Sequence, residues 1–411
     1  MRDLIRVAHS LGLKVIFDVV LHGCVDQEIV RWDMETFGPR YDFIFSEWLE
    51  RAPARSRYRD EHPEWFMRDE DGNIARVYTW AFDPANEAWQ DFIVDMLKYY
   101  VQDLGVDGFR FDAPTWNCMP NWDRHLPYRA SASYYGSHQL FVKVRQALRA
   151  ISPEVLMYTE PSGPLYRLTM DLNYNYDEEW LWSSLVDIVS PRGYSGSRSW
   201  DGHRLTAREM AEWLEYRRLA LPRGSVTVHH LDSHDTFWWG EKAQFRSEAF
   251  GPEAARALFA VCACLDGGLM NYVGGEKATE EFYRRMLQLR RTLPELRQGE
   301  CDYLAVECDD EMVFAPLRCW QGWYTIPIIN LANRETTCRL RLPLDRMGIQ
   351  PDARYTLWDA WNQRMVLPDK PAGCYGTELG EVPITLPPFG VAIWVVRAQE
   401  DRHLEQVARR R

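Results

Sequence analysis

Three stretches of the chain carry acidic residues in settings that suit acid chemistry, and the most informative is GFRFDAPT, residues 108–115. It sets Arg110 and Asp112 two residues apart near the end of a short apolar run. Side chains alternate along a strand, so both would point to one side, where the guanidinium keeps the carboxylate ionised. An ionised carboxylate at the end of a strand is what a covalent glycosyl-transfer nucleophile requires. Taken alone, an Arg-x-Asp pair in a strand is more often a structural ion pair.

Two further stretches repeat this arrangement. Glu160 ends the run VLMYTE and precedes Pro161, and His234 and Asp235 end the run HHLDSHD. In a parallel α/β barrel the C-terminal ends of all strands meet on one face, so acids far apart in the sequence can converge there. Each acid by itself fits a loop or helix-cap residue. Their occurrence at successive strand ends favours a shared site.

The elements that would position these acids alternate between helix and strand. An amphipathic helix over 2–11 leads into a buried strand over 14–21, and the helix over 88–104, closed by Gly105, leads into the strand that holds Asp112. The same pattern predicts helices over 134–150, 207–219, 254–264 and 280–293, with strands over 155–160, 168–174, 225–231 and 267–273. Six such strands indicate parallel strands with helical crossovers, in a barrel or a doubly wound sheet.

The pattern changes near Gly299. Short alternating runs separated by turn residues follow over 300–398, including runs at 303–306, 312–316, 323–330, 337–342, 354–359, 382–386 and 391–396. They predict an all-β domain of antiparallel strands. Residues 1–299 would then form the catalytic domain, and residues 399–411 a charged tail.

Composition narrows the classes of partner. The formal charge of −12 argues against nucleic acid or an anionic membrane as partner, and no apolar run is long enough to span a bilayer. The 18 Trp and 20 Tyr offer flat faces on which sugars stack, although most aromatic residues serve the core. Nine Cys without paired spacing or a metal motif indicate reduced thiols, and therefore a cytoplasmic protein.

Four short motifs together resemble the α-amylase superfamily, glycoside hydrolase family 13. They are FDVVLHG at 17–23, GFRFDA at 108–113, MYTEP at 157–161 and HLDSHDT at 230–236. The resemblance implies a (β/α)8-type barrel followed by a C-terminal β-sandwich. It also implies a retaining glycoside hydrolase that acts on the α-glucosidic bonds of α-glucans or maltooligosaccharides through a covalent glycosyl-enzyme intermediate.

The resemblance assigns a role to each acid. Asp112 matches the nucleophile and Glu160 the general acid/base, and a retaining pair of this kind lies about 5–5.5 Å apart. Asp235 matches the third acid, which holds sugar hydroxyl groups in the transition state. His234 would hydrogen-bond the same sugar.

Three further expectations come from the same resemblance. Asp18 matches the aspartate that orders the site around Arg110. Trp116, just beyond the nucleophile, is an aromatic platform for the acceptor, or else packs a loop. Residues 23–84 exceed an ordinary connection and match the inserted B domain that shapes the cleft.

The chain also departs from the family pattern. His22 and Gly23 stand where the first motif usually has Asn-His, and the Asn commonly helps to hold calcium, so we expect no cofactor and regard a structural calcium as doubtful. Thr115 and Trp116 replace the usual Lys-His of the second motif. Together with a nearby HPEWF sequence, the first-motif change resembles the glycogen-pathway maltosyltransferases. A transglycosylase or maltosyltransferase is therefore the alternative within enzymes.

The first complete helix–strand unit corresponds to the family's third strand. The sequence therefore predicts a barrel that lacks its first two strands, as expected of an N-terminally truncated or mis-started reading frame. Unpaired strand edges would be a liability for folding. A second alternative is thus an inactive sugar-binding protein, and a start further upstream would weaken the prediction of a cytoplasmic location.

Overall fold

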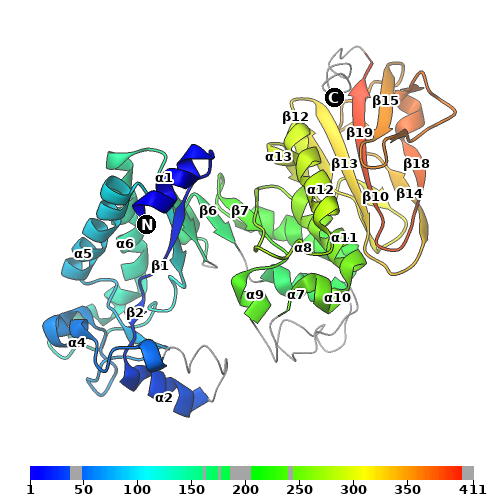
Figure 1. Ribbon diagram of the computed structural model, residues 1–411. Helices are drawn as coiled ribbons and strands as arrows, with labels where there is room; N and C mark the ends of the chain where they lie inside the picture. The colour runs from blue at the N-terminus through cyan, green and yellow to red at the C-terminus, as the bar shows by residue number, and fades with distance from the viewer. Residues whose placement is uncertain (38–48, 161–162, 175–176, 186–204, 239–243, 400–411) are drawn as a thin grey trace. The chain divides into compact units, whose positions relative to one another are not determined.

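The computed structural model describes residues 1–37, 49–160, 163–174, 177–185, 205–238 and 244–399 (Figure 1). The chain forms two compact units. One comprises Met1–Asn175 with Leu221–Val226, and the other Tyr176–Ala220 with Thr227–Arg411. The tail expected at 399–411 lies, apart from its first residue, outside the described residues. No described helix has the length and apolarity needed to cross a membrane.

The first unit is built on a parallel sheet. Its strands are β1 (Ile16–Val20), β4 (Gly108–Asp112), β5 (Leu156–Thr159) and β6 (Leu172–Tyr174), in that order. Helices α1 (Arg2–Ser10), α5 (Glu87–Tyr99) and α6 (Ser133–Ile151) alternate with these strands. The helix–strand alternation expected from the sequence is confirmed here to within a few residues.

Helix α5 packs on the parallel sheet, and residues at its two ends determine where it begins and ends. Its N-cap Asn86 accepts a hydrogen bond from the Trp89 backbone N–H, and a π-helical turn over Tyr100–Leu104 ends at Gly105, whose φ of 82° suits glycine. Apolar residues at helical spacing on α5 and α6 pack with Phe109 and Phe111 of β4 in one buried cluster. Figure 1 shows these two helices against the sheet. Because side chains alternate along a strand, Arg110 and Asp112 lie on the face of β4 opposite Phe109 and Phe111, where they can contact other residues.

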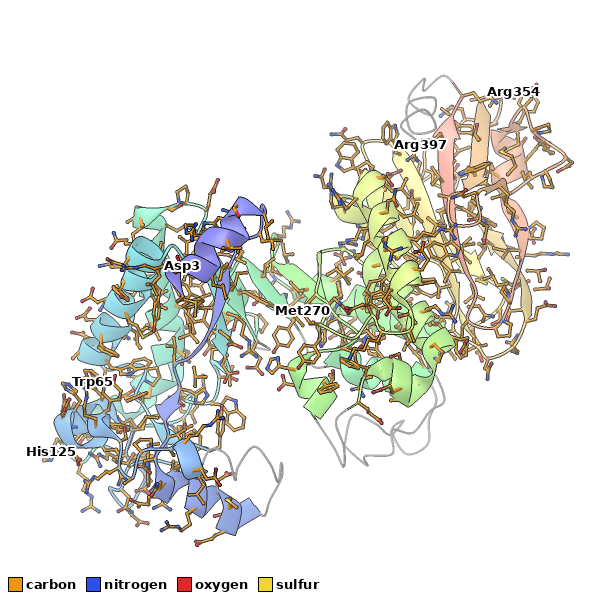
Figure 2. All side chains as sticks on the ribbon, in the orientation of Figure 1. Asp3, Trp65, His125, Met270, Arg354 and Arg397 are labelled. Atoms are coloured by element: carbon orange, nitrogen blue, oxygen red, sulfur yellow. The ribbon has the colours of Figure 1, made fainter. Side chains whose placement is uncertain are left out.

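Residues 23–84 hold small elements. Strands β2 (Gly23–Cys24) and β3 (Trp80–Ala81) pair antiparallel, and between them lie helices α2 (Gln27–Phe37) and α4 (Arg57–Glu61) and a 3-10 turn over Pro63–Trp65. Trp65, labelled in Figure 2, is buried and stacks on His62 with ring centroids 3.9 Å apart. Trp65 belongs to the same buried cluster as Phe109 and Phe111, so the segment packs with the sheet's helices and returns to the sheet through the β2–β3 pair.

The second unit begins with helical elements around two short parallel strands, β7 (Val226–His229) and β8 (Gly268–Leu269). The helices are α7 (Asp177–Leu185), α8 (Ala207–Ala220), α9 (His234–Trp238), α10 (Arg246–Phe250), α11 (Pro252–Cys264), α12 (Glu280–Thr292) and α13 (Pro294–Arg297). Helices α8, α11 and α12 match the expected ranges closely, whereas α7 was not expected.

The C-terminal part of this unit is a two-sheet β domain. One sheet has the order β10 (Glu307–Cys308), β14 (Thr336–Arg341), β18 (Glu381–Leu386). The other has the order β16 (Arg364–Met365), β15 (Arg354–Asp359), β19 (Val391–Ala398), β13 (Trp323–Asn330), β12 (Leu317–Trp320), β9 (Glu300–Asp302), with β11 (Val313–Phe314) on β13 and β17 (Cys374–Tyr375) on β15. All these pairs are antiparallel, as expected. The strand expected at 303–306 is wrong, because the pairing with β12 uses residues 300–302.

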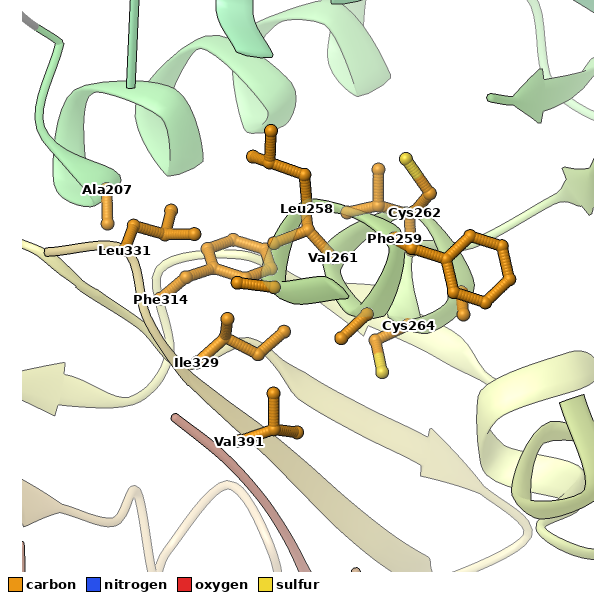
Figure 3. Close-up of a cluster of buried hydrophobic side chains, with 14 of the residues drawn as sticks. Ala207, Leu258, Phe259, Val261, Cys262, Cys264, Phe314, Ile329, Leu331 and Val391 are labelled. Carbon is orange, nitrogen blue, oxygen red and sulfur yellow. The ribbon is translucent and has the colours of Figure 1, made fainter. Parts of the chain in front are cut away.

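The β domain shares its core with the helices of the same unit. Helix α11 is buried along nearly its whole length, and its residues share one buried cluster with side chains of the β domain such as Ile329 and Val391, which Figure 3 shows beside the helix. A buried ion pair between Glu295 of α13 and Arg397 of β19, the latter labelled in Figure 2, adds a polar tie. The helices and sheets of this unit therefore form one packed body.

Candidate active site

One buried guanidinium organises the carboxyl groups at the end of the first unit's sheet. The β1–β4 register puts Asp18 opposite Arg110, and Arg110 Nη1 donates to Asp18 Oδ1 at 2.9 Å and to Asp112 Oδ1. Its Nη2 donates to the Tyr174 hydroxyl at 2.6 Å and lies 3.0 Å from Glu160 Oε2. The structure therefore brings three predicted acids, Asp18, Asp112 and Glu160, around the predicted site residue Arg110.

Asp112 has a second set of partners on its other oxygen. His22 Nε2 and the Tyr78 hydroxyl each lie 3.3 Å from Asp112 Oδ2, and they lie 2.6 Å from one another. Burial by itself would raise the pKa of Asp112, but the hydrogen bond from His22 and the charge of Arg110 hold that pKa well below its usual range. The side chain keeps 20% exposure. Asp112 is thus an ionised carboxylate that a solute can reach.

Glu160 is a more enclosed carboxyl group. It is buried, and its Oε2 accepts the backbone N–H of Ala113 at 2.5 Å. Ala113 has a φ of 35°, a left-handed conformation that turns the chain sharply after the strand. Glu160 and Asp112 also share a partner, because Arg110 Nη2 lies 3.0 Å from Glu160 Oε2 while Arg110 Nη1 donates to Asp112 Oδ1. Arg110 draws them together because it binds both.

Sequence reasoning did not identify His22 and Tyr78 as partners of Asp112. Val20 pairs with Asp112 across β1 and β4, and His22 lies two residues after Val20. The register of the two parallel strands could therefore have indicated that His22 lies near Asp112. Tyr78 arrives through the β2–β3 pair, where Gly23 is required because a Cβ there would lie 2.1 Å from the Thr79 hydroxyl oxygen. No local pattern in the sequence reveals that close approach. Burial raises the pKa of Tyr78, which keeps its hydroxyl protonated and able to donate.

Trp116 lies beside this site through Tyr78. Its side chain is exposed, and its ring meets the Tyr78 ring edge to face, with centroids 5.0 Å apart. The next residue, Asn117, is buried and donates to the backbone carbonyls of His22 and Phe82 at 2.6 Å each. The loop after Asp112 is therefore fixed to the β2–β3 segment. The role of Trp116 as a platform stays a prediction.

Asp235 and His234 belong to the second unit, whereas Asp112 and Glu160 belong to the first. His234 and Asp235 open helix α9, where Ser233 and Thr236 cap each other's backbone N–H groups. His234 is exposed and Asp235 is half-buried, with His234 Nε2 3.7 Å from Asp235 Oδ1. Strand β7 ends at His229, so both residues begin a helix rather than end a strand. Their predicted roles stay predictions.

A comparison with family models matches residues 1–287 to the α-amylase catalytic domain. The chain belongs to the α-amylase family. A cyclomaltodextrinase of Geobacillus thermopakistaniensis is 21% identical over 437 aligned positions, covering 97% of this chain and 62% of the relative. A cyclomaltodextrinase of Thermoanaerobacter pseudethanolicus is also 21% identical, covering 81% of this chain and 55% of the relative. The α-amylase-family chain described here thus spans less than two thirds of these relatives' lengths.

Solved structures of the same family support the fold. A maltogenic α-amylase from Thermotoga neapolitana superimposes with a TM-score of 0.66 at 18% identity, over 96% of this chain and 80% of that one. A debranching enzyme from Nostoc punctiforme gives a TM-score of 0.62 at 17% identity, over 96% and 78%. The expected fold class, a (β/α)8-type barrel architecture followed by an all-β C-terminal domain, is confirmed for this α-amylase-family chain.

Proposed function

We propose that the chain is a retaining glycoside hydrolase that cleaves α-glucosidic bonds in α-glucans or maltooligosaccharides. The observation that carries this proposal is the contrast between two neighbouring acids on one arginine. Asp112 is ionised and accessible, and Glu160 is buried against a backbone N–H. A reaction that needs one carboxylate to attack and one carboxyl group to deliver a proton uses such a pair.

In the proposed mechanism Asp112 attacks the anomeric carbon while Glu160 protonates the leaving oxygen. Glu160 then removes a proton from the water that cleaves the glycosyl-enzyme ester, which restores both groups. Arg110 keeps Asp112 ionised before attack, and Asp18 holds Arg110 in place. A sugar that enters the site would lie between the two carboxyl groups, with Arg110 remaining the partner of both.

Several finer assignments remain part of the proposal. Asp235 would stabilise the transition state, His234 and Asp18 would help to bind the sugar, and Trp116 would stack on the acceptor. The catalytic domain would end near residue 299, with residues 23–84 as an inserted domain that shapes the cleft. We expect no cofactor, so a chelator should leave turnover unchanged.

The proposal is tested by incubating the chain with maltohexaose and with a cyclic maltodextrin, the substrate class named for its cyclomaltodextrinase relatives. Shorter maltooligosaccharides whose new reducing ends first appear as the α-anomer in NMR would support it. Mainly longer oligosaccharides, or maltosyl phosphate when phosphate is added, would reveal a transferase. Binding without turnover would contradict an enzymatic function for this chain.

The covalent step has its own test. A fluorinated α-glucosyl fluoride, which forms the ester faster than water cleaves it, should add one glycosyl mass to the peptide that contains Asp112. Labelling of another carboxylate would overturn the assignment of the nucleophile without overturning the retaining mechanism.

A further inference from the structure

The C-terminal β domain contains a group of potential metal ligands that the glycosidase chemistry does not use. Cys308 of β10, the adjacent Asp309 and Cys338 of β14 each offer one ligand atom, and these atoms all lie within 4.8 Å of one another. It is the one group of three or more His, Cys, Asp or Glu side chains in such an arrangement among the described residues. Strand β10 is the edge of its sheet, so the group lies where solutes can enter.

Burial differs across the three residues in a way that suits an edge site. Cys338 is buried at 2% exposure within the core of the β domain, Cys308 is half-buried and Asp309 is exposed. The sulfurs therefore come from the protein side and the carboxylate from the solvent side. An ion bound between them would be largely enclosed but would keep one position open to water.

The strand register argues against a disulfide between the two cysteines. Cys308 pairs with Leu340, so Cys338 is its diagonal neighbour on β14 rather than its direct partner. Diagonal residues of antiparallel strands lie about 7–8 Å apart, beyond the Cα separation that a disulfide spans without backbone movement. A tetrahedral zinc ion with Zn–S bonds of ~2.3 Å instead bridges sulfurs nearly 4 Å apart. The diagonal position of the two cysteines therefore fits an ion that bridges their sulfur atoms better than a disulfide bond.

The surroundings of the ligands prepare them for a cation. Cys308 Sγ accepts the backbone N–H of Asp310 at 3.4 Å. Asp309 Oδ1 accepts the backbone N–H of Arg339 at 2.7 Å, which fixes the carboxylate and leaves its other oxygen for a ligand. These contacts hold one sulfur and one carboxylate in orientation from the backbone.

We propose that Cys308, Asp309 and Cys338 form a binding site for a thiophilic divalent cation of the Zn²⁺ type, with the fourth coordination position taken by water. Two thiolates select such a metal over Ca²⁺ or Mg²⁺, which prefer oxygen ligands. Binding releases the thiol protons and joins the edge strand β10 to β14. The ion stabilises the β domain because it binds the folded form with ligands that unfolding separates. This site is independent of the proposed glycosidase chemistry.

The test is a titration of the reduced, metal-free chain with Co²⁺ under anaerobic conditions. One equivalent should produce thiolate-to-Co²⁺ charge-transfer absorption and the visible bands of a tetrahedral ion, and Zn²⁺ should displace it. The Cys308→Ser variant should lose the charge-transfer band. Asp309→Asn, which preserves the contact with the Arg339 N–H, should keep the band but weaken affinity about tenfold or more.

Cys319→Ser is the matched control, because Cys319 is a half-buried cysteine of β12 in the same domain and outside the group. It should bind Co²⁺ as the unchanged chain does. Absence of a thiolate band at one equivalent, or a band that persists in Cys308→Ser, would overturn the proposal. Thermal unfolding of each variant without metal shows whether loss of the band reflects loss of the fold.

Discussion

Two carboxylates, one in each unit, have the same kinds of partner and different surroundings. Asp112 in the first unit contacts Arg110 and His22. Glu178 in the second unit accepts from Arg217 at 2.9 Å and lies 2.6 Å from His229 Nδ1, and it is fully buried. An arginine and a histidine around a carboxylate therefore do not identify a reactive group. Position at a strand end and access to solvent distinguish the two.

The pKa values of Asp112 and Glu178 are both lowered, for similar reasons. Burial alone would raise the pKa of both, and in each the charged and hydrogen-bonding neighbours prevail. Around Glu178, the His229 and Arg217 side chains lower the pKa to about 2. Both carboxylates are thus ionised at neutral pH. We expect the negative charge of Asp112 to be needed for the reaction and the negative charge of Glu178 to be needed for the stability of the fold.

The largest expected effect is the loss of turnover in Asp112→Asn. An amide cannot form the glycosyl ester, so kcat should fall by about four orders of magnitude or more. The fold should survive, because Arg110 keeps Asp18 and Glu160 as partners. Hydrolysis of maltohexaose and the thermal midpoint, measured on one preparation, check both halves. Activity near that of the unchanged chain would remove Asp112 from the chemistry.

Glu160→Gln should show a loss that depends on the substrate. Without the acid, bonds with poor leaving groups should be cleaved about 10²–10⁴-fold more slowly, whereas an activated aryl α-glucoside leaves without protonation and its first step should be nearly unaffected. The ratio of kcat/KM for the two substrates measures this contrast. Equal losses on both would assign Glu160 a positioning role rather than proton transfer.

Glu178→Gln should have the opposite effects to Asp112→Asn, with a loss of stability and an unchanged kcat. Removing the charge leaves Arg217 and His229 buried without their anionic partner, which costs about 3–5 kcal/mol of unfolding free energy. Urea unfolding followed by circular dichroism gives the loss. The surviving folded fraction should hydrolyse substrate at an unchanged kcat. A stable variant with low kcat would mean that the buried cluster acts in the reaction.

Acid should reveal the same cluster. The folded pKa of Glu178 is about 2 against an ordinary 4.5, so its contribution to stability is complete above about pH 4.5 and is lost as the pH falls towards 2. At ~1.4 kcal/mol per pKa unit, this amounts to about 3 kcal/mol. Unfolding free energies measured between pH 5 and 3 should fall more steeply for the unchanged chain than for Glu178→Gln. Parallel curves would contradict the shift.

The sequence revealed the chemistry at Asp112 better than the cluster at Glu178. Arg110 and Asp112 share a strand, and Asp18 pairs with Arg110 on the neighbouring strand, so local alternation and a family motif predicted their contact. Glu178 lies in α7, a nine-residue helix that contains three consecutive apolar residues, Trp180, Leu181 and Trp182, and therefore has only a weak helical period. Its partners come from α8 and β7, which only the folded chain brings together.

The same reasoning explains what was missed within the site. Tyr78 reaches Asp112 because Gly23 admits Thr79 at close range, a tertiary contact without a sequence period. Likewise, Asp112 and Glu160 come together through their shared contact with Arg110, which neither strand alone reveals. Patterns within one element were readable, and close approaches between loops were not.

The smallest predicted effect concerns the Tyr78 hydroxyl, which contacts Asp112 but not Glu178. Tyr78→Phe removes a donor to Asp112 Oδ2, worth about 1 kcal/mol, and the hydroxyl partner of His22 Nε2, so kcat/KM should fall about fivefold. Asp112 then loses one interaction that favours its ionised form, so the acidic limb of the pH–rate profile should move to higher pH. Tyr216→Phe, at an exposed tyrosine of α8, is the control and should change neither. A fall in rate without movement of the acidic limb would show that Tyr78 shapes the site without tuning the nucleophile.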